Sequence, residues 1–150
     1  MDTDVKRRRL QLFEQLCRDR GIPATVQRRA ILEAVLGLTT HPTADAVFSE
    51  VSRRIPGVSR TTVYRTLDAL FAMGLIAKAS HAGSAVRYDP NTSAHHHLVC
   101  RNCDAVIDVI DERLDHVPVP DTSLVGFVVT DHQVQFRGLC KNCRTKEDEP

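Results

Sequence analysis

The sequence predicts a mixed α/β (α+β) fold in two parts, an N-terminal winged helix-turn-helix and a small C-terminal α/β domain. Apolar residues recur at helical spacing in three segments before residue 75, which predicts three amphipathic helices. Short runs rich in Val and Phe follow and predict strands. Two Cys-x-x-Cys pairs after residue 99 indicate a separate small domain built around a metal ion.

The first two predicted helices occupy residues 27–38 and the segment between Thr43 and Pro56. The apolar stripe of the first consists of Ala30, Ile31, Ala34, Val35 and Leu38. Thr43 can cap the first turn of the second helix, and Pro56 followed by Gly57 ends it. The apolar face of this second helix consists of Ala46, Val47, Val51 and Ile55.

A third helix is predicted from the N-cap Ser59 to the C-terminal stop Gly74. Its inward face consists of Val63, Leu67, Leu70 and Phe71, and its outward face of Thr61, Tyr64, Arg65 and Asp68. After a two-helix lead-in, this helix has the position of the major-groove helix of a helix-turn-helix. Arg60 or Arg65 can contact guanine edges or phosphates, and Tyr64 a thymine methyl group or a phosphate. A protein-binding helix with a solvated face is the alternative.

Two short strands are predicted at residues 75–79 and 85–89, joined by a turn at residues 81–84. With the three helices they make a winged helix-turn-helix. The charge of this half suits a polyanion, because residues 1–88 contain 14 Lys and Arg against 8 Asp and Glu, whereas residues 89–150 contain 6 against 11. Segregation of surface charge by chance is the alternative.

Residues 90–94 are an uncharged, turn-prone break, which we interpret as a linker between a winged-helix domain at 1–89 and a metal-binding domain at 95–143. The second domain is predicted to contain three strands, at 95–100, 105–109 and 126–138, and a short helix or turn at 111–116. The tail at residues 144–150 is predicted to be disordered.

Composition limits the class of protein. The chain is 42% apolar and 26% charged, and it lacks both an apolar leader region and a run near the roughly 18 apolar residues of a membrane span. We therefore expect a cytoplasmic protein. Five cysteines, an odd number, argue against a disulfide framework and favour thiolates as metal ligands. No HExxH, GxSxG or phosphate-loop motif occurs, so we do not expect an enzyme.

The two cysteine pairs are separated by 36 residues, and each pair can chelate one ion. They are Cys100 with Cys103, and Cys140 with Cys143. Four thiolates in tetrahedral geometry favour Zn²⁺ and leave no open position for catalysis. Disulfides or a redox Cys-x-x-Cys are the alternatives. The fifth cysteine, Cys17, is predicted to be a core residue on an apolar helical face with Phe13 and Leu16.

Three consecutive histidines precede the first cysteine pair. Because side chains alternate along a strand, His95 and His97 share one face and His96 lies on the other. Two imidazoles at this spacing can provide two ligands of a second metal site, and the carboxylates of Asp89 and Asp108 can provide the others. A solvated pair of surface histidines is the alternative.

The chain resembles the ferric uptake regulator (Fur) superfamily of bacterial metal-dependent repressors. The resemblance covers nearly the whole chain and rests on the segments HPTADAVF, SRTTVYRTLDAL, RYDPNTSAHHHLVCRNC, DHQVQFRG and CKNC. It implies a homodimer with a C-terminal α/β dimerisation domain, a winged helix that binds a palindromic operator, and a structural Zn²⁺ on the four cysteines. It also implies a regulatory Fe²⁺ or Mn²⁺ between the domains, held by His41, Asp89, His95, His97 and Asp108.

An additional metal site is implied at His96, Asp115 and His132, but here the sequence departs from the family pattern. Ala94 stands where many ferric-uptake members have a histidine, and His96 where an aspartate is usual. The departure weakens the expectation of an ion at this place.

Asp108 resembles the peroxide-sensing branch of the family, since iron-uptake regulators usually have glutamate there. The resemblance then implies a repressor that leaves its operator when peroxide oxidises His41 or His95 through bound Fe²⁺. An iron- or zinc-responsive uptake regulator is the alternative. A metal-buffering or protein-interaction module is a further one, but it leaves the face of Thr61, Tyr64 and Arg65 without a role.

Overall fold

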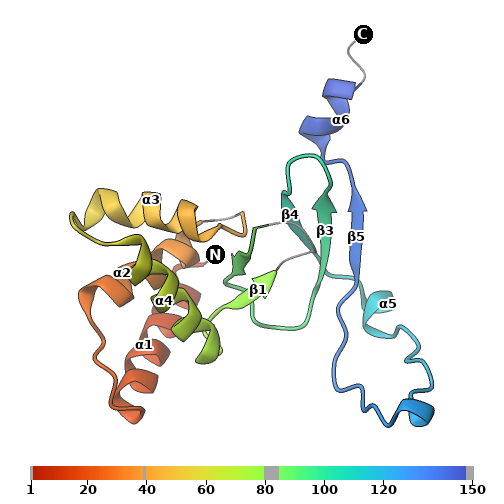
Figure 1. Cartoon of the computed structure of the whole chain (residues 1–150), viewed down its shortest axis with the longest axis horizontal. Helices are drawn as coiled ribbons and strands as arrows, with labels where there is room; N and C mark the ends of the chain where they lie inside the picture. Colours follow the sequence, from red (N-terminus) through yellow and green to blue (C-terminus); the bar gives the residue numbers. More distant parts are fainter. Residues whose placement is uncertain (1, 39, 80–84, 148–150) are drawn as a thin grey trace. The chain divides into compact units, whose positions relative to one another are not determined.

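The computed structural model describes residues 2–38, 40–79 and 85–147 (Figure 1). The chain divides into two units, Met1–Thr92 and Ser93–Pro150, and the division lies within the predicted linker. In the described part of the chain, no helix combines the length and the apolar content needed to cross a membrane.

The helices of the first unit confirm the three predicted ones and add one before them. They are α1 Thr3–Asp19, α2 Val26–Gly37, α3 Ala44–Arg54 and α4 Arg60–Ala72. Two N-caps are as predicted, because Thr43 Oγ1 accepts a hydrogen bond from the Ala46 N–H at 3.2 Å and Ser59 Oγ from the Thr62 N–H at 3.0 Å. Helix α4 stops before Gly74, whose φ of 70° suits a residue without a Cβ.

These helices enclose an apolar core. Val63, Leu67 and Leu70 of α4 are buried in it, as predicted. Cys17 of α1 is 1% exposed and is a core residue, also as predicted. The core fixes which face of α4 is turned outward.

Two apolar residues were assigned to the wrong face. Phe71 is 45% exposed, because a rotation of about 100° per residue places it about 80° from Val63, at the edge of the buried stripe. The Lys78 ammonium group lies 4.7 Å from its ring centroid. Ala46 of α3 is exposed as well, and Ala44 is buried instead.

The wing of the first unit is a two-stranded antiparallel sheet. Its strands are β1 Ala77–Ala79 and β2 Arg87–Asp89, both shorter than predicted. The predicted turn at residues 81–84 lies outside the described residues. Lys78 Nζ lies 2.8 Å from Asp68 Oδ1, and this ion pair joins β1 to α4.

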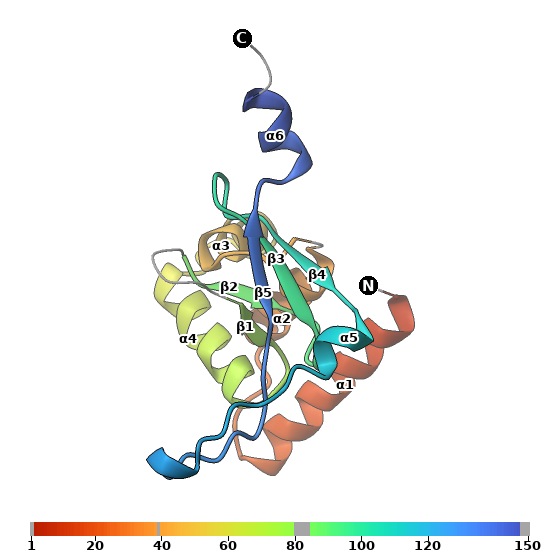
Figure 2. The ribbon, with the colours of Figure 1, turned by 90° about the vertical axis from the view of Figure 1, so that its right-hand side faces the viewer.

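The second unit contains a three-stranded sheet with β3 in the centre, which Figure 2 shows between β4 and β5. The strands are β3 His96–Cys100, β4 Val106–Val109 and β5 Gln135–Gly138. Strand β4 pairs with β3 in antiparallel fashion and β5 pairs with it in parallel. The helical elements are α5 Glu112–Asp115, the 3₁₀ helix η1 Ser123–Val125 and α6 Lys141–Glu147.

Two predictions for this unit need correction. Strand β5 comprises only residues 135–138 of the predicted strand 126–138, and it runs parallel to β3. The described part of the predicted disordered tail, up to Glu147, belongs to helix α6.

An apolar row crosses one face of the three-stranded sheet. Leu98 of β3 lies opposite Ile107 of β4 and Phe136 of β5 in the strand register. The three residues are 42%, 51% and 48% exposed. Exposed apolar groups that adjoin in this way are typical of an interaction surface.

Candidate metal centres and nucleic-acid interface

The four cysteines meet because of the sheet topology. Cys100 ends β3, and Cys140 follows the end of β5. Since these strands are parallel, their carboxyl ends lie at the same edge of the sheet, which brings together two pairs that are far apart in sequence. Cys103 is turned back by a bend in which the Asp104 N–H donates to the Cys100 carbonyl at 2.9 Å.

The geometry of this cluster fits Zn²⁺. The four Sγ atoms all lie within 4.8 Å of one another, and the Cys103 and Cys140 sulfurs are 3.7 Å apart. A tetrahedron with Zn–S bonds of about 2.3 Å has edges of about 3.8 Å. None of the four cysteines forms a disulfide, as the predicted ligand role requires.

Local hydrogen bonds favour the thiolate form of one cysteine. Backbone N–H groups of Cys140, Cys103 and Asn102 lower the pKa of the Cys100 thiol to about 6. Burial raises the pKa of Cys143 to about 12. A divalent cation among the four sulfurs would supply the positive charge that both thiolates need.

In the second unit, His95, His97 and Asp108 direct donor atoms toward one another. Asp108 lies opposite His97 in the register of β3 and β4. Its Oδ1 is 3.4 Å from His95 Nε2 and 3.5 Å from His97 Nε2, and the two imidazole rings stand edge to face with centroids 4.6 Å apart. The predicted sharing of one face by His95 and His97 is therefore confirmed.

The tautomer of His95 follows from its other ring nitrogen. Nδ1 lies 2.8 Å from the Ser93 carbonyl oxygen, which can only accept, so Nδ1 carries the hydrogen and donates it. The lone pair of neutral His95 is then on Nε2, which faces Asp108. A metal ion bound between these two atoms would use the lone pairs of both.

In the first unit, His41 and Asp89 form a buried pair with Nε2 and Oδ2 3.2 Å apart. The backbone of His41 has a φ of 29°, which is rare for a residue with a side chain. Strand β2 holds it there, since Arg87 donates to the His41 carbonyl at 3.1 Å and the Tyr88 N–H donates to the Pro42 carbonyl at 2.9 Å. The strain is consistent with a functional position.

The predicted DNA-contact residues of α4 do not share one environment. Thr61, Tyr64 and Arg65 are exposed, Tyr64 by 45%. Arg60 instead forms an ion pair with Asp45 of α3, and its guanidinium carbon lies 4.6 Å from the Phe48 ring centroid. Sequence reasoning missed this contact, because no pattern links residues 15 positions apart on two helices.

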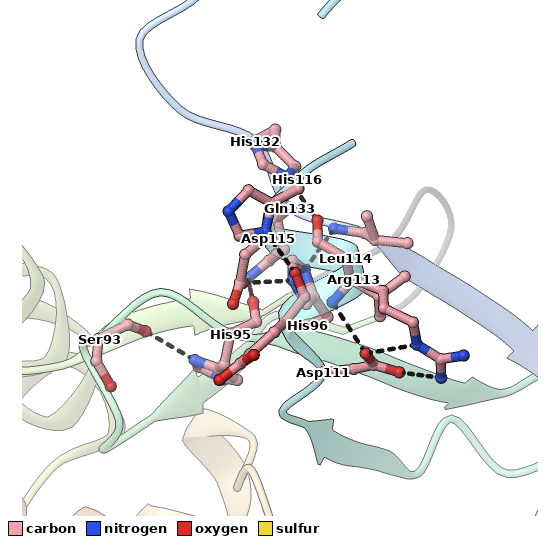
Figure 3. A network of polar contacts seen from close by, with 12 residues as sticks. Ser93, His95, His96, Asp111, Arg113, Leu114, Asp115, His116, His132 and Gln133 are labelled. Carbon is pink, nitrogen blue, oxygen red and sulfur yellow. Dashed lines mark hydrogen bonds and ion pairs between the residues drawn. The ribbon is translucent and has the colours of Figure 1, made fainter. Parts of the chain in front are cut away.

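The residues predicted for the additional metal site adjoin one another in the second unit, and Figure 3 shows them in a network of hydrogen bonds. His96 Nε2 lies 3.0 Å from Asp115 Oδ1, and the His96 and His132 ring centroids are 6.0 Å apart. In the described part of the chain, these three do not form a group whose ligand atoms all lie within 4.8 Å of one another.

Comparison with known proteins gives consistent matches. A sequence model of the ferric uptake regulator family matches residues 19–137. The peroxide-responsive repressor PerR of Staphylococcus saprophyticus is 33% identical over 129 residues, which are 86% of this chain and 87% of that protein. The peroxide operon regulator of Bacillus subtilis is 33% identical over 131 residues, which are 87% of this chain and 90% of that protein.

Solved structures extend the likeness to the fold. The ferric uptake regulator of Helicobacter pylori superposes with a TM-score of 0.77 at 19% identity and covers 93% of both chains. The peroxide stress regulator of Campylobacter jejuni gives a TM-score of 0.62 at 25% identity, over 95% of this chain and all of that one (100%).

Proposed function

Because this chain belongs to the ferric uptake regulator family, we propose that it is a metal-dependent transcriptional repressor that senses peroxide and acts in the cytoplasm. Two relatives at 33% identity are named for their response to peroxide. The observation that carries the proposal is the convergence of His95, His97 and Asp108 at the contact distances given above. The set of two imidazoles and one short carboxylate suits Fe²⁺ or Mn²⁺.

We propose two metal ions for each chain. Zn²⁺ on the four cysteines has a structural role, since it would clamp the ends of β3 and β5 to the start of α6. The regulatory ion would be bound by His95, His97 and Asp108 of the second unit together with His41 and Asp89 of the first. Neither subset alone offers the five or six ligands that Fe²⁺ or Mn²⁺ prefers.

Peroxide sensing would depend on the regulatory ion being iron. Fe²⁺ held by His95, His97 and Asp108 would supply the electrons for the reduction of hydrogen peroxide next to its ligand imidazoles. The protein contributes the fixed tautomer of His95 and the short side chain of Asp108, which reaches less far around the ion than glutamate. Oxidation of His41 or His95 would remove a lone pair and with it the affinity for the metal.

The DNA interface would be the exposed face of α4. Tyr64 and Arg65 project from it, and the first part of the chain carries the positive charge that phosphate contacts require. Arg60 is exposed as well and remains a proposed DNA contact, but its ion pair with Asp45 would make its contribution smaller than that of Arg65.

The apolar row of Leu98, Ile107 and Phe136 supports a homodimer. A second copy of this chain is the partner expected for such a face, since palindromic operators are bound by twofold-symmetric proteins. Burial of the row would remove three large side chains from water, each worth about 1 kcal/mol at roughly half exposure.

A mobility shift of operator DNA tests the proposal. The duplex is selected from random sequence with the Mn²⁺-loaded protein, and binding is compared with and without Mn²⁺ at constant zinc occupancy. A repressor of this class shifts the duplex only when the regulatory metal is present. A metal-buffering module would bind the ion and shift no DNA, and a hydrolase would convert a substrate without requiring DNA.

A further inference from the structure

His96 is buried between two proposed metal ligands without sharing their face. It is 2% exposed, and alternation along β3 directs it away from the side of His95 and His97. A buried imidazole is costly unless both ring nitrogens have hydrogen-bond partners. Its partners therefore determine what this residue can do.

Both nitrogens of His96 are engaged. The Val134 N–H donates to Nδ1 at 3.1 Å, so Nδ1 carries the lone pair and the neutral ring has its hydrogen on Nε2. Nε2 lies 3.0 Å from Asp115 Oδ1 and donates to that carboxylate. A metal ion on either nitrogen would have to break one of these bonds.

His132 is held through one of its two ring nitrogens. Its Nε2 lies 2.8 Å from the Leu114 carbonyl oxygen, which only accepts, so Nε2 carries the hydrogen and the lone pair of the neutral ring is on Nδ1. Figure 3 shows His132, Leu114, Asp115 and His96 next to one another in this network. Because both nitrogens of His96 are engaged, and because His96, Asp115 and His132 form no group with ligand atoms within 4.8 Å of one another in the described part of the chain, this donor set does not fit an additional ion.

The segment before β5 contacts His95 and the two histidines of β3, His96 and His97. Val134 donates to His96 through its N–H and accepts from the His97 N–H at 3.0 Å through its carbonyl. Gln133 Nε2 donates to the His95 carbonyl at 3.3 Å. His96 is the side chain that ties this segment and Asp115 of α5 to the strand.

We propose that His96 and Asp115 form a metal-free bridge in place of the additional ion, and that the bridge positions His95 and His97 for the regulatory metal. The second part rests on the proposed function. Asp115 fixes the ring of His96, and Nδ1 of that ring accepts from the Val134 N–H. Residues 133 and 134 in turn hydrogen-bond to the backbone of His95 and His97, on both sides of His96. Loss of the bridge would let the two ligand imidazoles vary in orientation and so weaken the regulatory site.

Three variants of the full-length, zinc-loaded protein test the bridge. Asp115→Asn keeps an oxygen that accepts from Nε2–H but is a poor metal ligand, Asp115→Ala removes the acceptor, and Glu112→Gln is the matched control on an exposed position of α5. Total metal is counted per chain after saturation with Mn²⁺, and Mn²⁺ affinity is measured by titration. Zinc content and circular dichroism report on folding.

We expect one zinc and one manganese per chain in the wild type and in all three variants. Asp115→Ala should bind Mn²⁺ about tenfold more weakly, the order of effect expected for one partly buried hydrogen bond to a charged group, while Asp115→Asn and Glu112→Gln stay within about twofold of the wild type. A third ion in the wild type that Asp115→Asn lacks would overturn the bridge. So would equal Mn²⁺ affinity in Asp115→Ala and the wild type.

A metal-independent measurement separates the bridge from the proposed function. In a long-range ¹H–¹⁵N spectrum of the zinc-loaded protein without Mn²⁺, His96 should show a protonated Nε2 and an unprotonated Nδ1. If no protein binds Mn²⁺ beyond its zinc, the proposed function fails, and the spectrum alone decides on the bridge. The opposite tautomer of His96 would refute it in either case.

Discussion

Arg65→Ala is the sharpest test of the DNA interface. Arg65 lies on the exposed face of α4, beside Tyr64 and one turn after Thr61. Its truncation leaves the buried face of Val63 and Leu67 unchanged, so the fold should persist. The variant therefore isolates the contribution of one guanidinium group to operator binding.

The magnitude follows from symmetry and counterion release. A dimer carries two copies of Arg65, and each phosphate contact contributes about 0.9 to the slope of log affinity against log salt concentration. The variant should then have a slope smaller by about 1.8. Between about 50 and 200 mM salt, the wild type should lose about tenfold more affinity than Arg65→Ala.

Arg60→Ala is the matched comparison. Its guanidinium group is also exposed, but it is paired with Asp45 and stacked on Phe48, so the salt slope should change by less than about 0.5. Fluorescence anisotropy with a labelled operator at saturating Mn²⁺ measures both slopes. An Arg65→Ala protein with unchanged slope and unchanged affinity at each salt concentration would refute the placement of α4 on the DNA.

Three further predictions concern the metals. Cys140→Ser should lose stoichiometric zinc and the dimer together, and one zinc per chain retained in that variant by atomic absorption would contradict the structural site. Operator DNA should tighten Mn²⁺ binding by the factor by which Mn²⁺ tightens DNA binding, a coupling of about 1–3 kcal/mol that His41→Ala or His97→Ala abolishes without loss of zinc. Equal Mn²⁺ affinity with and without operator would exclude this coupling. Dilute peroxide should add one oxygen atom to a peptide containing His41 or His95 in the Fe²⁺ protein and release it from DNA, whereas Asp108→Glu should bind DNA with metal yet respond poorly. Unmodified histidines on a repressor that stays bound would favour an iron- or zinc-uptake regulator.

Local signals in the sequence predicted much of the first unit. The caps Thr43 and Ser59 and the stop at Gly74 depend on neighbouring residues only, and they lie where their residue types predict. The prediction that Phe71 is buried was wrong, because a residue at the edge of an apolar stripe is buried only if a second element covers it. The ammonium group of Lys78 in β1 lies against the Phe71 ring instead, and the spacing of residues within α4 could not predict that contact.

The second unit was harder to predict from the sequence, because a strand forms only where a neighbouring strand pairs with it. The segment 126–138 contains several Val and Phe residues, yet strand β5 comprises only its last four residues. The Cys-x-x-Cys spacing predicted each cysteine pair, but the parallel arrangement of β3 and β5 that joins the pairs is a property of the topology. The family resemblance had grouped Asp115 with His96, but no sequence pattern predicted the Val134 N–H, 38 residues away, as the partner of its second ring nitrogen.

The linker itself orients one proposed ligand on each side of it. In the first unit, the Asn91 N–H donates to Asp89 Oδ1 at 2.7 Å, and in the second, the Ser93 carbonyl accepts from His95 Nδ1 at 2.8 Å. A regulatory ion bound to Asp89 and His95 would favour the linker conformation in which both bonds are made. Reciprocally, operator DNA that selects one arrangement of the two units would favour the orientation of those ligands. The short segment that separates the two ligand subsets would thus give coupling between metal and DNA one structural route.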